Sequence, residues 1–165
     1  MTGSRLDPWI DAYAARAMGM TASEIRALFA VASRPEVVSL AGGMPYVDAL
    51  PMEAIAQTVH DLLISQGSVA LQYGNGQGDQ TLREQIGEVM APVGVSAHPD
   101  DIVVTAGSQM ALDLVTRVFC DPGDVILVEA PSYVGALGVF RSYQVDVRHV
   151  AMDSGGLVAE ALREA

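Results

Sequence analysis

The alternation of apolar strands and helices after Asp101 is the feature that most constrains the fold. Strands separated by helices in this way form parallel sheets with helices on both faces. The sequence therefore predicts an α/β fold with a mostly parallel sheet. The expected strands are "DIVVTA", "VILVEA" and "QVDVRHV", and the expected helices are "SQMALDLVTRVF", "VGALGVFRSY" and "LVAEALREA".

The upstream half of the chain is predicted to be mainly helical. Short helices over 7–32 end at Arg34-Pro35, because the residue before a proline is pushed out of the helical conformation. A short apolar strand, "EVVSLA", then leads into Gly42-Gly43. Apolar residues at helical spacing in "MEAIAQTVHDLLISQ" predict an amphipathic helix. Another helix is expected from about Asp79 to Met90, with Asp79 as its N-cap.

Composition excludes several classes of function. A net charge of -11 and an isoelectric point near 4.4 leave no basic face for nucleic acid. No apolar run approaches the roughly 20 residues of a membrane-spanning helix, and the N-terminus does not have the layout of a signal peptide. A cytoplasmic protein is therefore expected. Cys120, the one cysteine, has no metal-ligand companions and is interpreted as a small buried hydrophobe. No metal site is predicted.

All nine basic residues of the chain are arginine, and none is lysine. Codon bias in a GC-rich genome would explain this composition. The chemical consequence is that lysine chemistry, such as a Schiff base with a carbonyl compound, cannot be completed by this chain alone.

The join between "DIVVTA" and "SQMALDLVTRVF" is a candidate anion site. Ligands of open parallel sheets bind at the carboxyl ends of strands, where helix N-termini carry partial positive charge. Gly107 lets the backbone approach an anion, and Ser108 and Gln109 bring hydroxyl and amide donors. Local sequence alone does not separate this interpretation from a plain helix cap at Ser108.

A second candidate follows the next strand. Tyr133 comes after "VILVEAPS" and is expected at the same edge of the sheet as Ser108. Its ring could stack on a flat cofactor, or it could be a core aromatic.

Together these segments resemble the pyridoxal-phosphate-dependent aminotransferases of class I/II, fold type I. The similarity is greatest to the 2-aminoadipate and aromatic aminotransferase-like subgroup. It is carried by "VSLAGGMP", "LQYGNGQGDQTLREQI", "DDIVVTAGSQMALDLV" and "DPGDVILVEAPSYVGAL", which occur in the family's order and spacing. The similarity extends over essentially the whole chain from about Ser23.

The resemblance implies roles for individual residues. Gly107, Ser108 and Gln109 would hold the phosphate of pyridoxal 5'-phosphate, and Tyr133 would stack on its pyridine ring. Tyr73 would reach the phosphate held by the other subunit of a homodimer. Arg26 would face the substrate side chain and Gly43 the substrate carboxylate. The substrates would be an amino acid and a 2-oxo acid.

The resemblance also implies a fold and a division of the chain. Residues 1–45 would be an N-terminal helical arm and small-domain segment, and residues 46–165 the first part of the cofactor-binding large domain. In the family's sheet, the strands matching "DIVVTA" and "VILVEA" are separated by strands that this chain lacks. Open apolar edges would result. The chain is therefore expected to be an N-terminal portion of a longer enzyme, a split subunit completed by a C-terminal polypeptide, or a remnant.

Family members exceed twice this length, and the resemblance places their catalytic lysine and several cofactor and substrate ligands outside the segments matched here. The expected function is transamination with pyridoxal 5'-phosphate, with this chain inactive alone and no catalytic residue in it. A non-catalytic aminotransferase-like interaction or scaffold protein is the alternative. A transcription factor with this domain would need a DNA-binding module upstream, and a generic phosphate-ester domain would not explain the other matched blocks.

Overall fold

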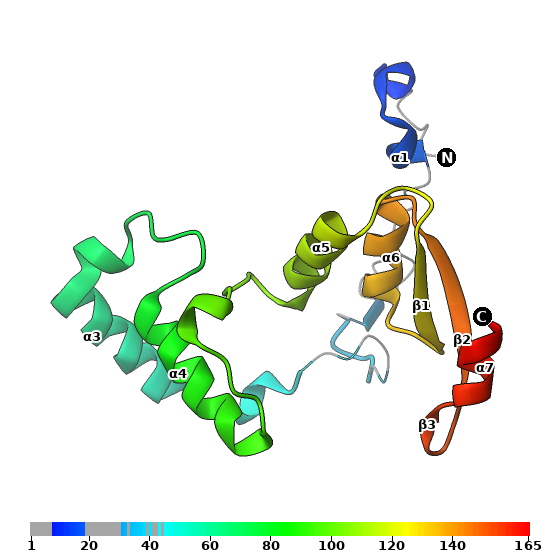
Figure 1. Cartoon of the computed structure of the whole chain (residues 1–165). Coiled ribbons are helices and arrows are strands. Elements are labelled where there is room, and N and C mark those ends of the chain that lie inside the picture. Colours follow the sequence, from blue (N-terminus) through cyan, green and yellow to red (C-terminus); the bar gives the residue numbers. More distant parts are fainter. Residues whose placement is uncertain (1–7, 19–30, 33, 39, 41–42, 44) are drawn as a thin grey trace. The chain divides into compact units, whose positions relative to one another are not determined.

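The structure of the chain, a computed structural model, describes residues 8–18, 31–32, 34–38, 40, 43 and 45–165. The chain forms two compact units (Figure 1). Residues 28–105 make up the helical unit, and residues 106–165 together with 1–27 make up the sheet unit. The division of the sequence at residue 45 stays a prediction.

The sheet unit is built on a parallel pair of strands joined by a helix. It contains a 3-10 turn η1 (Ile10–Ala12), α1 (Ala15–Met18), α5 (Ser108–Phe119), β1 (Val125–Ala130), α6 (Val134–Ser142), β2 (Asp146–Asp153), β3 (Gly156–Leu157) and α7 (Ala159–Glu164). β1 pairs with β2 in parallel, from Val125 opposite Asp146 to Ala130 opposite Ala151. The short β3 adds an antiparallel pairing to β2. The predicted α/β class is confirmed, with a small mixed sheet.

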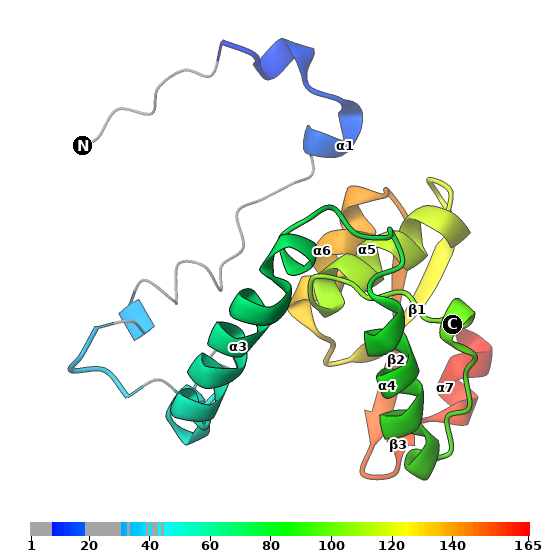
Figure 2. The same cartoon turned by 90° about the vertical axis from the view of Figure 1, so that its left-hand side faces the viewer.

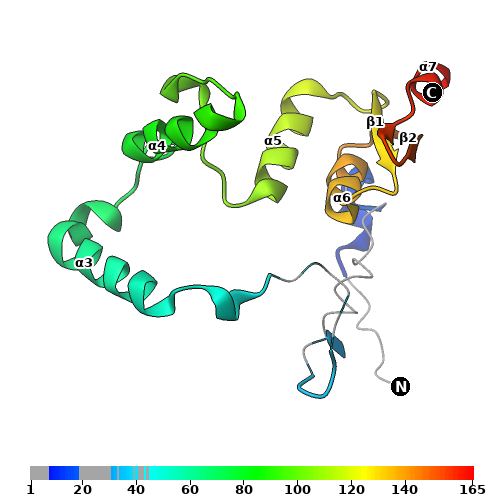
Figure 3. The ribbon, with the colours of Figure 1, turned by 90° about the horizontal axis from the view of Figure 1, so that it is seen from below.

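Helices accompany both strands of the parallel pair. In Figures 1 and 3, α6 lies on one side of β1 and β2, and α7 lies on the other. Both helices contact β2, and α5 contacts α6. The most enclosed side chain is Val150 on β2, which is 1% exposed. Val128, Ala136, Val139 and Val145 are also buried, so the core described here lies between α6 and the two strands.

The helical unit contains two long helices. Its elements are η2 (Val47–Ala49), α3 (Met52–Ala70), α4 (Gln80–Met90), η3 (Ala91–Val93) and η4 (Pro99–Asp101), and the course of α3 and α4 can be followed in Figure 2. α3 runs four residues past the predicted end, with non-helical backbone at Gln66. The side chain of Asp79 accepts a hydrogen bond of 2.9 Å from the amide of Leu82, which confirms the predicted N-cap of α4.

The predicted amphipathic helix forms, but its apolar face is not covered by the described residues. Ile55, Val59, Leu62 and Leu63, the positions at helical spacing on α3, are all exposed. Apolar side chains gathered on one face normally mark a surface that packs against something else. None of the helices in the described part of the chain has both the length and the apolar character needed to cross a bilayer.

Two predicted strands are not found among the described residues. Ile102–Thr105 belongs to no strand, and neither do the described residues of "EVVSLA", which are Glu36–Val38 and Leu40. A strand is defined by the ladder of hydrogen bonds that it makes with a neighbour. Valine-rich sequence favours extended backbone, but among the described residues no strand lies beside either segment. The Val104 amide donates instead to the Gln77 carbonyl, at 2.8 Å.

Arg83 connects three segments of the helical unit through hydrogen bonds. Its side chain, on α4, is buried with 4% of the residue exposed. The guanidinium donates to the Pro99 carbonyl at 2.6 Å and to the Gly78 carbonyl at 3.3 Å, and it lies 3.5 Å from an Asp100 carboxylate oxygen. One buried cation therefore joins α4 to the loop before it and to η4 after it.

We predict that Arg83→Met destabilises the helical unit by about 2 kcal/mol, because it removes charge-assisted hydrogen bonds and keeps most of the apolar stem. Hydrogen exchange of the Val104 amide should then accelerate roughly 30-fold. The control is Arg163→Met, since Arg163 is exposed and pairs on α7 with Glu160. Unchanged exchange at Val104 in Arg83→Met would contradict the role given to Arg83.

Candidate functional site

The start of α5 is an exposed helix N-terminus with Gly107 as its N-cap. Gly107, the N-cap, has φ 82° and ψ 167°, a conformation that is essentially restricted to glycine. Apart from the neighbours of Gly107 in the chain, no described residue has a heavy atom within 4 Å of the position that a Cβ would take there. Gly107, Ser108 and Gln109 are all exposed, and the first turn of α5 contains no acidic residue. The partial positive charge of this helix end therefore faces solvent without a competing carboxylate on its own first turn.

The side chains of Ser108 and Gln109 differ in what they contact. Among the described residues, the Ser108 hydroxyl has no hydrogen-bond partner. The Gln109 side chain instead reaches α6, where its Nε2 donates to the Gly135 carbonyl at 3.0 Å. One of the two amide N–H bonds of Gln109 is therefore committed to α6, and Ser108 is the more available donor at the start of α5.

Tyr133 meets Gln109 at this helix start. It is the N-cap residue of α6 and follows β1 through Pro131, whose peptide bond with Ala130 is cis, and Ser132. Its hydroxyl lies 3.5 Å from Gln109 Oε1 and can donate to it, and the residue remains 60% exposed. The structure thus brings together Gln109 and Tyr133, which are predicted at one edge and lie 24 residues apart. Tyr133 is not a core aromatic.

A triad of polar side chains holds α5 and α6 together at the other end. The Tyr143 hydroxyl accepts a hydrogen bond from Arg117 Nε at 2.8 Å and donates one to Asp113 at 2.9 Å. Arg117 also donates to Asp113, at 2.7 Å. The hydrogen bond with Tyr143 and the charge of Asp113 raise the pKa of Arg117 above its ordinary value. The arginine therefore stays charged at any ordinary pH.

Sequence analysis missed this triad. Asp113 and Arg117 stand four residues apart on one helix, a spacing typical of an ion pair. Tyr143 carries no local signal, because it reaches Asp113 across 30 residues of sequence.

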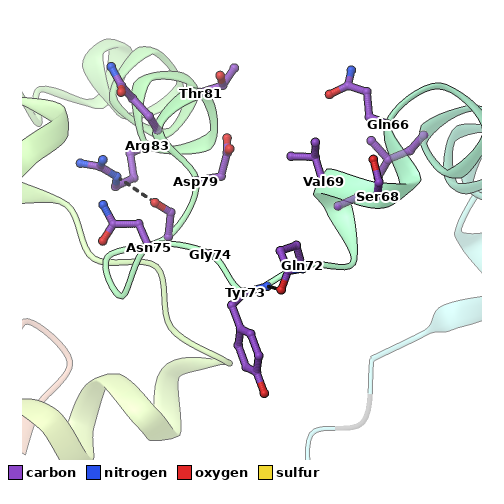
Figure 4. Close-up of a pocket in the computed structure, with 14 residues that line it drawn as sticks. Gln66, Ser68, Val69, Gln72, Tyr73, Gly74, Asn75, Asp79, Thr81 and Arg83 are labelled. Atoms are coloured by element: carbon purple, nitrogen blue, oxygen red, sulfur yellow. Dashed lines mark hydrogen bonds between the residues drawn. The ribbon is translucent and has the colours of Figure 1, made fainter.

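The other predicted site residues lie elsewhere. Tyr73 belongs to the helical unit, where it is 100% exposed at the rim of a hollow of about 910 Å³ that is lined mainly by polar residues between Gln66 and Arg83. Its ring points away from that hollow, while its amide donates to its neighbour Gln72 at 2.8 Å (Figure 4). Gly43, also in this unit, has φ 62°, and beyond its chain neighbours no described residue lies within 4 Å of its Cβ position. Arg26 lies outside the described residues. The structure does not place these three relative to Ser108.

Comparison with known proteins identifies the family. The family model "Aminotransferase class I and II" matches residues 35–165. The chain belongs to this family. The match includes Gly43, Tyr73 and the whole start of α5 with Tyr133. The resemblance inferred from the four sequence blocks is thereby confirmed.

Among curated aminotransferases, "Aromatic-amino-acid aminotransferase 1" of Thermococcus litoralis is 39% identical over 153 residues. That alignment covers 92% of this chain and 37% of the relative. "2-aminoadipate transaminase" of Thermus thermophilus is 40% identical over 133 residues, which cover 81% of this chain and 32% of the relative. Both belong to the subgroup predicted from the sequence.

A solved structure of the same family shares the fold. The kynurenine aminotransferase of Pyrococcus horikoshii, crystallised in a complex with PMP, superposes with a TM-score of 0.82 at 37% identity. The superposition covers 92% of this chain and 38% of that one. The chain therefore spans less than two fifths of the length of these aminotransferases.

We predict that Gly107→Ala costs the sheet unit about 1–3 kcal/mol, because alanine is strained at this φ and ψ. Steric overlap adds no further cost in free energy, because no described residue beyond the chain neighbours lies near the Cβ position. The control is Gly138→Ala, in the open on α6, which should stabilise the helix by roughly 0.5–1 kcal/mol. Thermal unfolding and amide exchange in the first turn of α5 measure both effects. An equal change in stability for Gly107→Ala and Gly138→Ala would contradict backbone strain at position 107.

Proposed function

We propose that this chain contributes the cofactor-phosphate side of an aminotransferase that moves an amino group between an α-amino acid and a 2-oxo acid. Membership of the family supports the reaction type. The cofactor proposed is pyridoxal 5'-phosphate, which supplies an electron sink for amino-group transfer when it is bound. Support comes from the PMP named for the P. horikoshii relative.

The observation that carries the proposal is the meeting of Tyr133 with Gln109 at the first turn of α5. An anion there would accept hydrogen bonds from backbone N–H groups of the helix start and from the Ser108 hydroxyl. The exposed Tyr133 ring lies beside the same turn and offers a flat apolar surface. A phosphate joined to an aromatic ring fits this pairing better than a simple inorganic anion, because only the aromatic ring could stack on Tyr133.

The remaining roles rest on the resemblance alone. We propose that Tyr73 reaches the phosphate bound by the second subunit of a homodimer, which its full exposure permits. Gly43 would lie near the substrate carboxylate and Arg26 near the substrate side chain. A cytoplasmic location also stays a prediction from the sequence.

We further propose that a polypeptide equivalent to the rest of the relatives' length completes the fold. Three features of the described residues support this proposal. β1 is at the end of its sheet, so one side of the strand has no strand beside it. Residues Ile102–Thr105 are valine-rich but join no sheet, and the apolar face of α3 is exposed. Open strand edges and apolar faces of this kind pair readily with added chain.

The second candidate function is a non-catalytic aminotransferase-like interaction protein. The absence of lysine from all 165 residues permits it, because lysine is the residue that forms a Schiff base with pyridoxal phosphate. The two candidates make opposite predictions when the part of the relatives' length that this chain does not span is supplied.

We predict that co-expression with the C-terminal part of the T. litoralis relative, the part this chain does not span, yields a soluble complex. This complex should bind pyridoxal 5'-phosphate with the absorbance of a lysine-linked cofactor and should transaminate. The chain alone should show no such band, because it lacks lysine. A complex that forms but binds no cofactor would favour the interaction protein.

Within that complex, Ser108→Ala should weaken cofactor binding about tenfold, the cost of one hydrogen bond to a charged group. The control is Ser154→Ala, an exposed serine in the turn between β2 and β3, which should bind as the unmodified chain does. Equal affinities for the two variants would contradict a phosphate at Ser108.

A further inference from the structure

Gly135 is crowded in a way that the other described glycine of α6 is not. A Cβ built on Gly135 would lie 2.5 Å from Tyr133 Cζ, 2.6 Å from the Tyr133 hydroxyl oxygen and 2.7 Å from Gln109 Oε1. Non-bonded heavy atoms make favourable contact only at about 3.5–4.0 Å. Gly138, one turn further along the same helix, has nothing within 4 Å of its Cβ position.

Glycine at position 135 therefore leaves space for the side chains of Tyr133 and Gln109. Gly135 lies in α6 and is not among the residues with positive φ, so its backbone would accept any L residue. This differs from Gly107, where the backbone conformation demands glycine and the surroundings are open. The two glycines therefore differ, because the backbone conformation restricts position 107 and the neighbouring side-chain ends restrict position 135.

The space at Gly135 is filled by the two side chains that meet at the start of α5. The end of the Tyr133 ring lies against the Gly135 backbone, and Gln109 donates to the Gly135 carbonyl at 3.0 Å. The bond between the Tyr133 hydroxyl and Gln109 is long, at 3.5 Å. Packing on the bare Cα, more than this weak hydrogen bond, therefore holds the ring beside Gln109.

We propose that Gly135 is a positioning residue that keeps the Tyr133 ring beside the start of α5, where it stacks on the aromatic ring of the bound cofactor. The inference rests on the proposed function and adds a residue to which no role has been given. A side chain at position 135 displaces the ring into solvent, because Tyr133 is 60% exposed and free to rotate outward. The helix itself keeps its backbone, so the variant folds.

Gly135→Ala separates ring stacking from phosphate binding. In the complemented enzyme, this variant should bind pyridoxal 5'-phosphate roughly three- to tenfold more weakly, the worth of an aromatic contact. Inorganic phosphate, measured by competition, should lose less affinity than the cofactor, because the atoms nearest the added Cβ belong to Tyr133 and to the end of the Gln109 side chain, and not to Ser108. Gly138→Ala, which makes the same chemical change on the same helix, should alter neither affinity.

A double variant tests whether the effect passes through Tyr133. In a Tyr133→Leu background, which removes the ring, Gly135→Ala should have little further effect on cofactor affinity. Full cofactor affinity in Gly135→Ala, or an equal loss of cofactor and inorganic phosphate, would overturn the inference. So would an undiminished effect in the Tyr133→Leu background.

A measurement without cofactor keeps this inference distinct from the proposed function. In NMR spectra of the full chain with labelled tyrosine, the Tyr133 ring should show a nuclear Overhauser contact to the Gly135 Hα protons. That contact should disappear in Gly135→Ala and persist in Gly138→Ala. A contact that survives in Gly135→Ala overturns the inference. If the contact behaves as expected but no complex of the chain binds cofactor, it is the proposed function that fails.

Discussion

The parallel pairing of β1 with β2 is the interaction on which the sheet unit depends. Parallel strands cannot be joined by a tight turn, so the chain must return through a crossover, and here α6 makes it. The crossover buries Ala136 and Val139 near Val128 and Val150, and this cluster is the core. It also places Tyr133, at the beginning of α6, directly after the end of β1. The position of the candidate site is therefore a consequence of strand pairing.

The same requirement for a paired neighbour explains where regular structure ends. Ile102–Thr105 has the composition of a buried strand, yet without an adjacent strand it makes no ladder. The division between the helical and sheet units falls immediately after these residues. The α3 helix is a similar case. It forms with its apolar face exposed, and the described residues do not include a partner that packs on that face. A chain that spans less than two fifths of its relatives would leave such surfaces.

Around the start of α5, polar contacts select one arrangement among several that the hydrophobic core would allow. The triad of Asp113, Arg117 and Tyr143 links α5 to α6 at one end, and Gln109 links them at the other through the Gly135 carbonyl. Exposed hydrogen bonds of this kind contribute little stability individually. Their effect is on register, because two links along one helix pair oppose both sliding and rotation.

The sequence by itself determined the helices from Met52 onward, the β1 and β2 strands, the Asp79 cap and the family. All of these depend on local spacing or on blocks of adjacent residues, which a single chain displays directly. Residues 19–30 of the helical segment predicted over 7–32 lie outside the described residues. The sequence also located the start of α5 as a candidate site, although local sequence left a cap and an anion site equally open. Only the tertiary structure decided that Tyr133 is exposed beside Gln109, that Tyr143 closes a triad with Asp113 and Arg117, and that the ends of the Tyr133 and Gln109 side chains lie next to Gly135. Tertiary structure also decided that Ile102–Thr105 does not form the predicted strand, because no described strand pairs with it. Each of these outcomes depends on which distant segment lies alongside, and residue type and spacing do not encode that information locally.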